Sequence, residues 1–345
     1  LSQRVTSEIH EPSRARTIKN VPLAGVTLVD MRQELVEGNR SIFSRDLRSS
    51  MIECLNADEQ MILFLNRRGS SSYVQCANCG TGVKCRRCDV FLTYHKRLQL
   101  LLCHYCGYKK GLQSICLNCR SYQMNFYGLG TQTVVDEINN HFPDTAVLRW
   151  DRDSATNIKS HQEILEKFRS RKSQILVGTQ MIAKGLHFPH VTLVGVISAD
   201  QGLTIPDYRS GERVFQLLYQ VSGRSGRGPR AGKVVIQTYQ PENYAIKTAT
   251  EQDYQKFYSK EMLYRREQGN PPYNKLIRLI YSHRNPTASY REVTRMTKMI
   301  CEEKQIHGYS DIDILGPTQA YPPRLRGEYR WHIVLRGREP KLLIT

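Results

Sequence analysis

The stretch QMILFLNRRG, at residues 60–69, is a short apolar run that ends in a basic loop. Such a run is typical of a strand that is buried on both faces of a parallel sheet and leaves it through a β-to-α loop. Residues 124–142 read as a further strand, a glycine turn and a helix, and residues 161–172 read as an amphipathic helix. Other apolar runs of strand length lie at residues 146–153, 174–185, 191–200 and 232–239.

Strands that alternate with helices predict an α/β fold, in which a parallel sheet carries helices on both faces. Functional groups in such sheets collect at the carboxyl ends of the strands. The acidic pair Asp136 and Glu137 superficially resembles the carboxylates of an ATPase. However, Val134 and Ile138 place this pair in the middle of an amphipathic helix, so we interpret it as a solvated helix face.

The composition favours a folded, basic protein. Hydrophobic residues make up 40% of the 345 residues, which excludes wholesale disorder. Fifty Lys and Arg residues against 32 Asp and Glu give a net charge of +18, which makes nucleic acid a candidate partner. No apolar run approaches the roughly 18–20 residues of a membrane span, so we expect no membrane partner. The chain opens at Leu1 without a signal peptide, and we interpret it as a fragment of a longer protein.

Eight of the ten cysteines stand in four C-x-x-C pairs. Each pair can supply two of the four thiolates of a tetrahedral zinc site from one tight turn, whereas disulfide exchange needs only one such pair. We therefore predict two closed, structural Zn²⁺ sites in a reduced, intracellular protein. The pairs are Cys76 with Cys79, Cys85 with Cys88, Cys103 with Cys106, and Cys116 with Cys119.

The spacing of the pairs favours a nested arrangement. In this arrangement Cys85, Cys88, Cys103 and Cys106 share one ion across a hairpin, and the outer four share the other. Sequential pairing is cramped because only five residues separate Cys79 from Cys85, and an interleaved cross-brace is the alternative. Two nearby histidines are weaker candidates than any cysteine, and we interpret them as surface residues; they are His95 and His104.

The stretch QVSGRSGRG, at residues 220–228, sets two arginines in a bed of glycine and serine, which indicates a phosphate ligand. A G-x-x-x-x-G-K-[ST] phosphate loop does not occur in the sequence, and its nearest imitation, GPRAGKV at residues 228–234, has the wrong spacing. We therefore expect that the chain alone does not hydrolyse ATP.

These motifs together point to a family. FLNRRG, the four C-x-x-C pairs, YGLGTQ, ILVGTQMIAKG and QVSGRSGRG, in this order, resemble the C-terminal half of the primosomal protein N′ (PriA) family of superfamily 2 DNA helicases. EQGNPPYNKLIRL (267–279) and ILGPTQAYPPRLRGEYRWHIVL (314–335) resemble that family's C-terminal domain. The resemblance covers essentially the whole chain, and the eight-cysteine insertion makes it specific.

The resemblance implies a division into four parts. Residues 1–75 and 121–240 would form the second RecA-like helicase lobe, and residues 76–120 the zinc-binding insertion. A helical linker at residues 241–271 would lead to a small α+β, S10-like C-terminal domain at residues 272–345, which we expect to stop early.

The resemblance also implies roles for single residues. Arg227 would be the arginine finger that acts on ATP bound by another lobe. Three residues would contact or couple to the nucleotide, namely Gln220, Arg224 and Gly185. Four residues would contact DNA, namely Thr179, Gln180, Lys184 and Arg67. Leu186 and His187 depart from the His-Asp of many relatives, which puts a ribose contact in doubt.

The function implied is that of an ATP-dependent 3′-to-5′ DNA helicase, which recognises stalled or branched replication forks and restarts replication by primosome assembly. ATP and Mg²⁺ would bind only with the first lobe, which carries the phosphate loop. Its partners would be forked or single-stranded DNA, single-strand binding protein and primosome proteins, in the bacterial cytoplasm at the nucleoid. The alternative is a zinc-bearing DNA- or partner-binding module without ATPase activity of its own.

Overall fold

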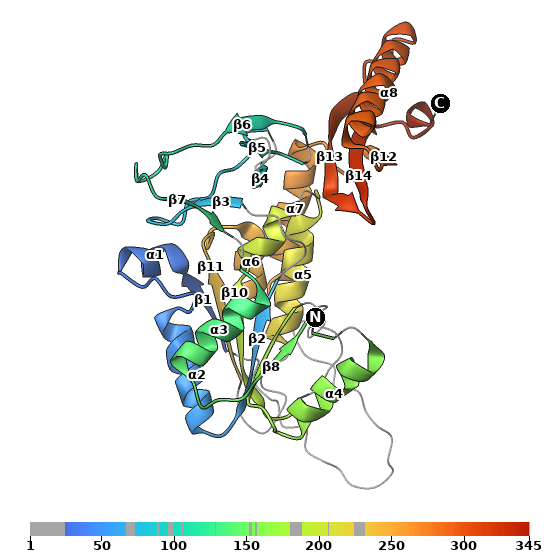
Figure 1. Ribbon diagram of the computed structural model, residues 1–345. Coiled ribbons are helices and arrows are strands. Elements are labelled where there is room, and N and C mark those ends of the chain that lie inside the picture. Colours follow the sequence, from blue (N-terminus) through green and yellow to red (C-terminus); the bar gives the residue numbers. More distant parts are fainter. Residues whose placement is uncertain are drawn as a thin grey trace.

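The computed structural model describes residues 25–66, 73–87, 90–95, 99–104, 106–127, 129–151, 154–155, 157–179, 188–205, 207–223 and 232–344 (Figure 1). Six parallel strands form its central sheet, in the order β1-β11-β10-β2-β9-β8. The predicted parallel sheet is confirmed, and the edge strand β1 is an addition that the sequence did not predict. The strands are β1 (Gly25–Asp30), β2 (Gln60–Leu65), β8 (Val147–Trp150), β9 (Ile175–Gly178), β10 (Val191–Ser198) and β11 (Lys233–Thr238).

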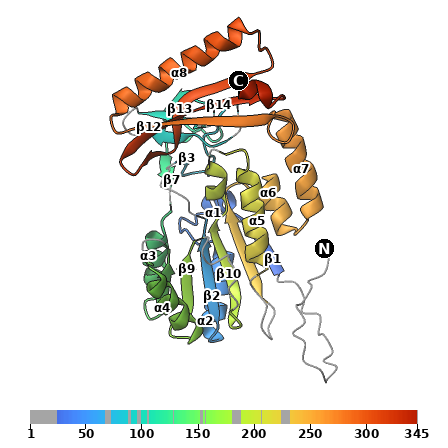
Figure 2. The ribbon, with the colours of Figure 1, turned by 90° about the vertical axis from the view of Figure 1, so that its right-hand side faces the viewer.

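Helices cover both faces of this sheet. Figure 2 shows α5, α6 and α7 together on one side of it. Among the described helices, none combines the length and apolar character that crossing a membrane requires. The helices of this part of the chain are α1 (Met31–Val36), α2 (Arg45–Asn56), α3 (Thr131–His141), α4 (Ile158–Arg169), α5 (Ser210–Ser222), α6 (Tyr244–Thr250) and α7 (Tyr254–Glu267).

Strand β2 is buried on both faces, as its unbroken apolar sequence predicts. Because side chains alternate along a strand, Met61, Leu63 and Leu65 enter the core that α2 and α3 cover. Ile62 and Phe64 point the other way, into the larger core formed with α4, α5, α6 and α7. The two cores therefore meet at β2, and its neighbours β10 and β9 are fixed by the same burial.

The cysteine-rich module is inserted between β2 and α3. It forms a five-stranded antiparallel sheet in the order β6-β5-β4-β3-β7. Strand β7 was expected to belong to the lobe but pairs with β3, so the module's sheet reaches beyond residues 76–120 on both sides. The strands are β3 (Tyr73–Cys76), β4 (Thr93–His95), β5 (Leu100–Leu102), β6 (Lys109–Gly111) and β7 (Met124–Tyr127).

The C-terminal domain follows α7 and a proline break at Pro271 and Pro272. Its antiparallel sheet has the order β12-β14-β13, and α8 packs on one face of it (Figure 2). Trp331 lies against this core beside Tyr290 of the helix, at a ring-centroid distance of 4.9 Å, as expected for a packed strand residue. The elements are β12 (Lys275–His283), α8 (Pro286–Ile306), β13 (Asp313–Leu325) and β14 (Glu328–Gly337).

We predict that Gln237→Leu destabilises the lobe. The buried Gln237 amide accepts a hydrogen bond from Ser44 N and donates to the carbonyl oxygens of Ile42 and Ile197, at 2.8, 2.8 and 3.0 Å. Leucine leaves these backbone groups without their partner, so the free energy of unfolding should fall by about 2–4 kcal/mol. Denaturant unfolding measures this, with the exposed Gln216→Leu on α5 as the matched control, for which we expect a change within about 0.5 kcal/mol. Equal stability of the two variants would contradict the prediction.

Candidate metal centre and motor residues

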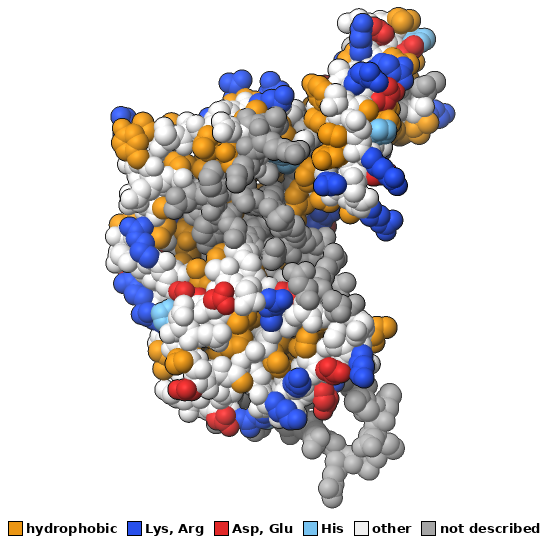
Figure 3. Space-filling view, in the orientation of Figure 1, with side chains coloured by type: hydrophobic (Ala, Val, Ile, Leu, Met, Phe, Trp, Pro, Cys, Tyr) orange, Lys and Arg blue, Asp and Glu red, His pale blue; other side chains and the backbone are white. Residues whose placement is uncertain are grey.

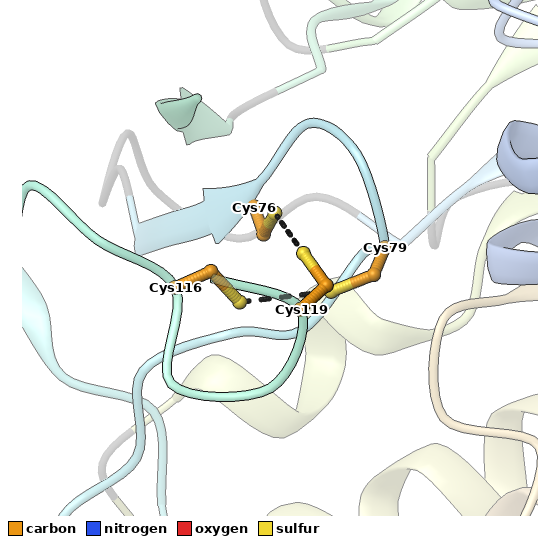
Figure 4. Close-up of side chains that lie close together, drawn as sticks. All are labelled: Cys76, Cys79, Cys116 and Cys119. Carbon is orange, nitrogen blue, oxygen red and sulfur yellow. Dashed lines mark hydrogen bonds between the residues drawn. The ribbon is translucent and has the colours of Figure 1, made fainter. Parts of the chain in front are cut away.

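Four cysteine sulfurs from two distant turns meet at the end of the module nearest the lobe (Figure 4). The Sγ atoms of Cys76 and Cys119 lie 3.6 Å apart, as do those of Cys79 and Cys116. All four sulfurs lie within 4.8 Å of one another, and this is the outer set of the predicted nested arrangement. The spacing fits the edges of a tetrahedron of thiolates around one zinc ion, whose Zn–S bonds are about 2.3 Å long.

The two thiols of the Cys76–Cys79 turn differ in acidity. Burial raises the pKa of the Cys79 thiol, but hydrogen bonds with Thr81 and Asn118 together lower it to about 6. Burial raises the pKa of the neighbouring Cys76 thiol to about 12, and a metal, which binds the thiolate form, would displace the proton of that thiol.

A second group brings together Cys85, Cys103 and Cys106, with the Sγ atoms of Cys85 and Cys106 separated by 3.7 Å. These are three of the four residues of the predicted inner set. The fourth, Cys88, lies outside the described residues.

The turns that carry these cysteines share one backbone geometry. In the three of these turns that the structure describes, the residue after the second cysteine has a positive φ and donates its N–H to the carbonyl of the first cysteine: Gly80 and Gly107 at 2.9 Å, and Arg120 at 3.0 Å. Glycine adopts this conformation at no steric cost, whereas Arg120 is strained. The pattern C-x-x-C-G was visible in the sequence, and it was the signal for two of these turns.

The first cysteine group rests directly on the lobe. A Cβ atom built on Gly80 would lie 2.5 Å from Tyr239 Cδ1 and 2.9 Å from Arg32 Cγ, so the turn packs closely between these two side chains. Arg40 adds a hydrogen bond of 2.7 Å from its guanidinium to the carbonyl oxygen of Ala77. The lobe therefore holds the turn from two sides.

Asp200 supports this contact from inside the lobe. The buried carboxylate accepts hydrogen bonds from Thr238 Oγ1, Tyr239 N and Gln240 Nε2, at 2.8, 2.9 and 3.2 Å. Burial raises the pKa of this carboxyl despite these bonds. Asp200 thus fixes the turn after β11 that carries Tyr239 onto Gly80. This role was not predicted, because the residues it links are separated in sequence by up to 40 positions.

The prediction that both module histidines are surface residues was wrong for His104, which is 2% exposed, and His95 is only half-buried. Their Nε2 atoms lie 3.0 Å apart, and His104 Nδ1 lies 2.8 Å from the carbonyl oxygen of Gln319 in β13. Burial, together with the charge of His104, lowers the pKa of His95 to about 4. Burial also lowers the pKa of His104, although the Gln319 carbonyl opposes this. Sequence spacing could not reveal a partner 215 residues away.

The acidic pair considered from the sequence is structural, and so is Asp151. Asp136 and Glu137 lie on α3, where Val134 and Ile138 face the core, as predicted. Asp151 caps the turn after β8 by accepting a 2.9 Å hydrogen bond from Ser154 N.

Of the residues that the resemblance places near nucleotide or DNA, two are described. Thr179 is half-buried and directly follows β9, at the carboxyl edge of the sheet. Gln220 is exposed in the last turn of α5, which runs back from the end of β10 to the start of β11. Thr179 therefore lies at the carboxyl ends of the strands, and Gln220 lies toward their amino ends. Lying outside the described residues are Arg67, Gln180, Lys184, Gly185, Leu186, His187, Arg224 and Arg227.

We predict that Gly80→Ala loosens the module. The added methyl group meets Tyr239 and Arg32, and φ at this position is +70°, so stability should fall by about 1–3 kcal/mol. Gly111→Ala is the control, because its Cβ meets no atom within 4 Å and its φ is not positive. Thermal unfolding of the two variants compares them, and a Gly80→Ala protein as stable as Gly111→Ala would refute the close contact.

Three family models match the chain. Residues 85–110 match the PriA DNA helicase Cys-rich region domain, and residues 139–229 match the helicase conserved C-terminal domain. Residues 266–344 match the primosomal protein N C-terminal domain. Among solved structures, the C-terminal domain of the DEAD-box protein Dbp5 is similar only distantly, with a TM-score of 0.34 and 12% identity over 68% of this chain and 86% of that one.

Curated relatives match most of the length of the chain. The Replication restart protein PriA of Bacillus subtilis (strain 168) is 44% identical over 317 residues, which is 91% of this chain and 38% of the relative. The protein of the same name from Synechocystis sp. is 40% identical over 326 residues, which is 92% of this chain and again 38% of the relative. The chain thus spans well under half the length of these relatives. With a Cys-rich region, a helicase C-terminal domain and a PriA C-terminal domain, it belongs to the PriA family of replication restart proteins.

Proposed function

We propose that this chain is the C-terminal part, with the second motor lobe, of an ATP-dependent DNA helicase that moves 3′ to 5′, recognises stalled or branched replication forks and restarts replication by primosome assembly. The observation that supports this most is the joining of a helicase lobe, a Cys-rich module and a PriA C-terminal domain in one chain. Relatives named replication restart proteins share this combination over 91% and 92% of its length.

In this proposal ATP and Mg²⁺ bind between this lobe and another lobe that carries the phosphate loop. Arg227 reaches the transferred phosphoryl group as an arginine finger, and Arg224, Gln220 and Gly185 contact the nucleotide or couple to it. Phosphoryl transfer depends chiefly on stabilising the charge of the transition state, and a guanidinium from a second lobe contributes about 10³–10⁵ in rate. The exposure of Gln220 at the end of α5 fits a residue that faces a partner lobe.

DNA would lie along the carboxyl edge of the sheet, where Thr179 follows β9. Gln180, Lys184 and Arg67 follow the ends of β9 and β2 in sequence, so they would contact the same strand of DNA. The module, on this edge, is strongly basic: Asp89 is the single acidic residue in the sequence of residues 73–127. Figure 3 shows Lys and Arg side chains over the module and over the C-terminal domain. Single-strand binding protein and primosome proteins would be further partners, in the bacterial cytoplasm at the nucleoid.

We also propose that the two cysteine groups each hold one structural Zn²⁺ ion. Cys76, Cys79, Cys116 and Cys119 would hold the first, and Cys85, Cys88, Cys103 and Cys106 the second. Four thiolates close each coordination sphere, so the ions would stabilise the fold and leave no open position for a reaction.

The zinc proposal predicts two zinc ions per chain after purification under reducing conditions. Cys116→Ser and Cys85→Ser should each lower the zinc content to about one, because each removes a ligand from a different site. Cys301→Ser, which lies outside both groups, should retain two. Elemental analysis of the purified proteins measures this, and one ion or none in the unaltered chain would defeat the two-site proposal.

The motor proposal predicts no DNA-stimulated ATP hydrolysis by this chain alone. When the chain is joined to a lobe with a phosphate loop, Arg227→Ala should lower kcat by about 10³-fold and leave DNA affinity unchanged. Arg230→Ala, three residues further on, is the control and should retain activity.

Steady-state ATPase and DNA-binding assays measure both effects. Hydrolysis of ATP by the chain alone would contradict the proposal that another lobe must supply the phosphate loop. Full turnover by the joined Arg227→Ala protein would favour the alternative, a binding module without a catalytic arginine.

A further inference from the structure

The two cysteine groups of the module contact two different parts of the protein, the lobe and the C-terminal domain. The first group rests on the lobe through Gly80, as described above. The second group faces the C-terminal domain instead. His104 follows the ligand Cys103, and Gly107 follows the ligand Cys106, and both lie against β13. Each group therefore has its own neighbour.

The contact with β13 is short and specific. His104 Nδ1 lies 2.8 Å from the Gln319 carbonyl oxygen, and a Cβ atom built on Gly107 would lie 3.7 Å from Thr318 Cβ. The ring of Tyr321 stands edge-on to His104 at a centroid distance of 6.3 Å. Both sides are buried, since Thr318 is 1% exposed and His104 is 2% exposed.

The directions of these hydrogen bonds follow from the groups involved. A carbonyl oxygen can only accept, so Nδ1 of His104 must carry the proton and donate. In a neutral ring Nε2 of His104 is then the acceptor, and His95 Nε2–H donates to it. A series of hydrogen bonds therefore runs from β4 through the Cys103–Cys106 turn to β13, each donating in the same direction. It requires one orientation of the His104 ring.

The interface around these hydrogen bonds is polar, and some of its buried polar atoms have no hydrogen-bond partner among the described residues. Thr318 Oγ1 and His332 Nδ1, cross-strand neighbours in β13 and β14, are buried without a hydrogen-bond partner among the described residues. Buried polar atoms without partners cost stability, so such an interface gains little from burial alone. The Cys103–Cys106 turn lies against this interface and carries both His104 and Gly107.

We propose that the second metal site is a latch for the C-terminal domain: metal bound there orients His104 and Gly107 against β13, and loss of the metal releases the domain. His104 acts as a positioning residue and does not ligate the metal. The inference rests on the proposed metal binding at the second site and is independent of helicase activity. Because coupling is reciprocal, docking of β13 must also strengthen metal binding at this site.

The test measures the distance between the lobe and the C-terminal domain in the full chain. Labels carried by unnatural amino acids at Val36 and Ile306, which are 74% and 73% exposed, leave every cysteine intact. Zinc-loaded protein should give one narrow distance distribution. Removal of zinc by a chelator, or Cys106→Ser, should broaden it, whereas Cys301→Ser, which lies outside both cysteine groups, should leave it narrow.

His104 variants separate the latch from general damage to the fold. His104→Leu should broaden the distribution while two zinc ions remain bound. His104→Asn should stay narrow, because an asparagine amide can donate from the position of Nδ1. His190→Leu, at an exposed position of the lobe, is the surface control. Zinc release from the second site to a coloured chelator should be about tenfold faster in His104→Leu than in His104→Asn.

Two results would overturn the latch. One is a narrow, unchanged distribution after the second site has lost its metal. The other is a His104→Leu protein with both ions, a narrow distribution and unaltered zinc release. A chain that binds no metal at the second site would instead refute the zinc proposal, and elemental analysis of the same samples detects that separately.

Discussion

Burial of β2 on both faces is the constraint on which the arrangement of the chain depends. Because β2 is central and every neighbouring strand runs parallel to it, its carboxyl end can open only at one edge of the sheet. The chain leaves β2 there, builds the module and returns into α3 at the same edge. The module must therefore sit where the loops after β9, β10 and β11 also emerge, which is the edge where functional groups gather in such sheets.

The module is too small to hold its shape by apolar burial. Among the described residues of the module, one small cluster is buried, and partly buried side chains such as Tyr94 and Tyr108 pack against it. The cluster consists of Val74, Val83, Cys85, Leu92, Leu101 and Cys103. Domains of this size generally need metals or disulfides, because too little surface is removed from water on folding. The cysteine groups thus take the place of a core, and they fix the direction of the two turns that meet other parts of the chain, one on the lobe and one on β13.

The sequence predicted the features that depend on local pattern. Apolar runs identified five strands of the central sheet, and the C-x-x-C spacing identified the outer group of four cysteines. Other features depend on partners far along the chain. The edge strand β1 is only partly buried, so it lacks the strong apolar signal of β2. His104 looks like a polar residue in a basic loop, and only β13, more than 200 residues later, makes it a buried one. Strand β7 was assigned to the lobe because local sequence does not specify which sheet a strand joins.

The two contacts of the module differ in kind, and this difference decides which of them can open. The contact with the lobe sets Gly80 in close van der Waals contact with Tyr239 and Arg32. The buried Asp200 holds the turn after β11, which carries Tyr239, in place. The contact with the C-terminal domain consists of His104 with the ring of Tyr321 beside it and of the Gly107 backbone, and it includes buried polar atoms that have no partner in the described part of the chain. Close packing is lost all at once and at high cost, whereas a single directed hydrogen bond can break and re-form. Movement between the lobe and the C-terminal domain would therefore separate the module from β13 first, and the module would stay with the lobe.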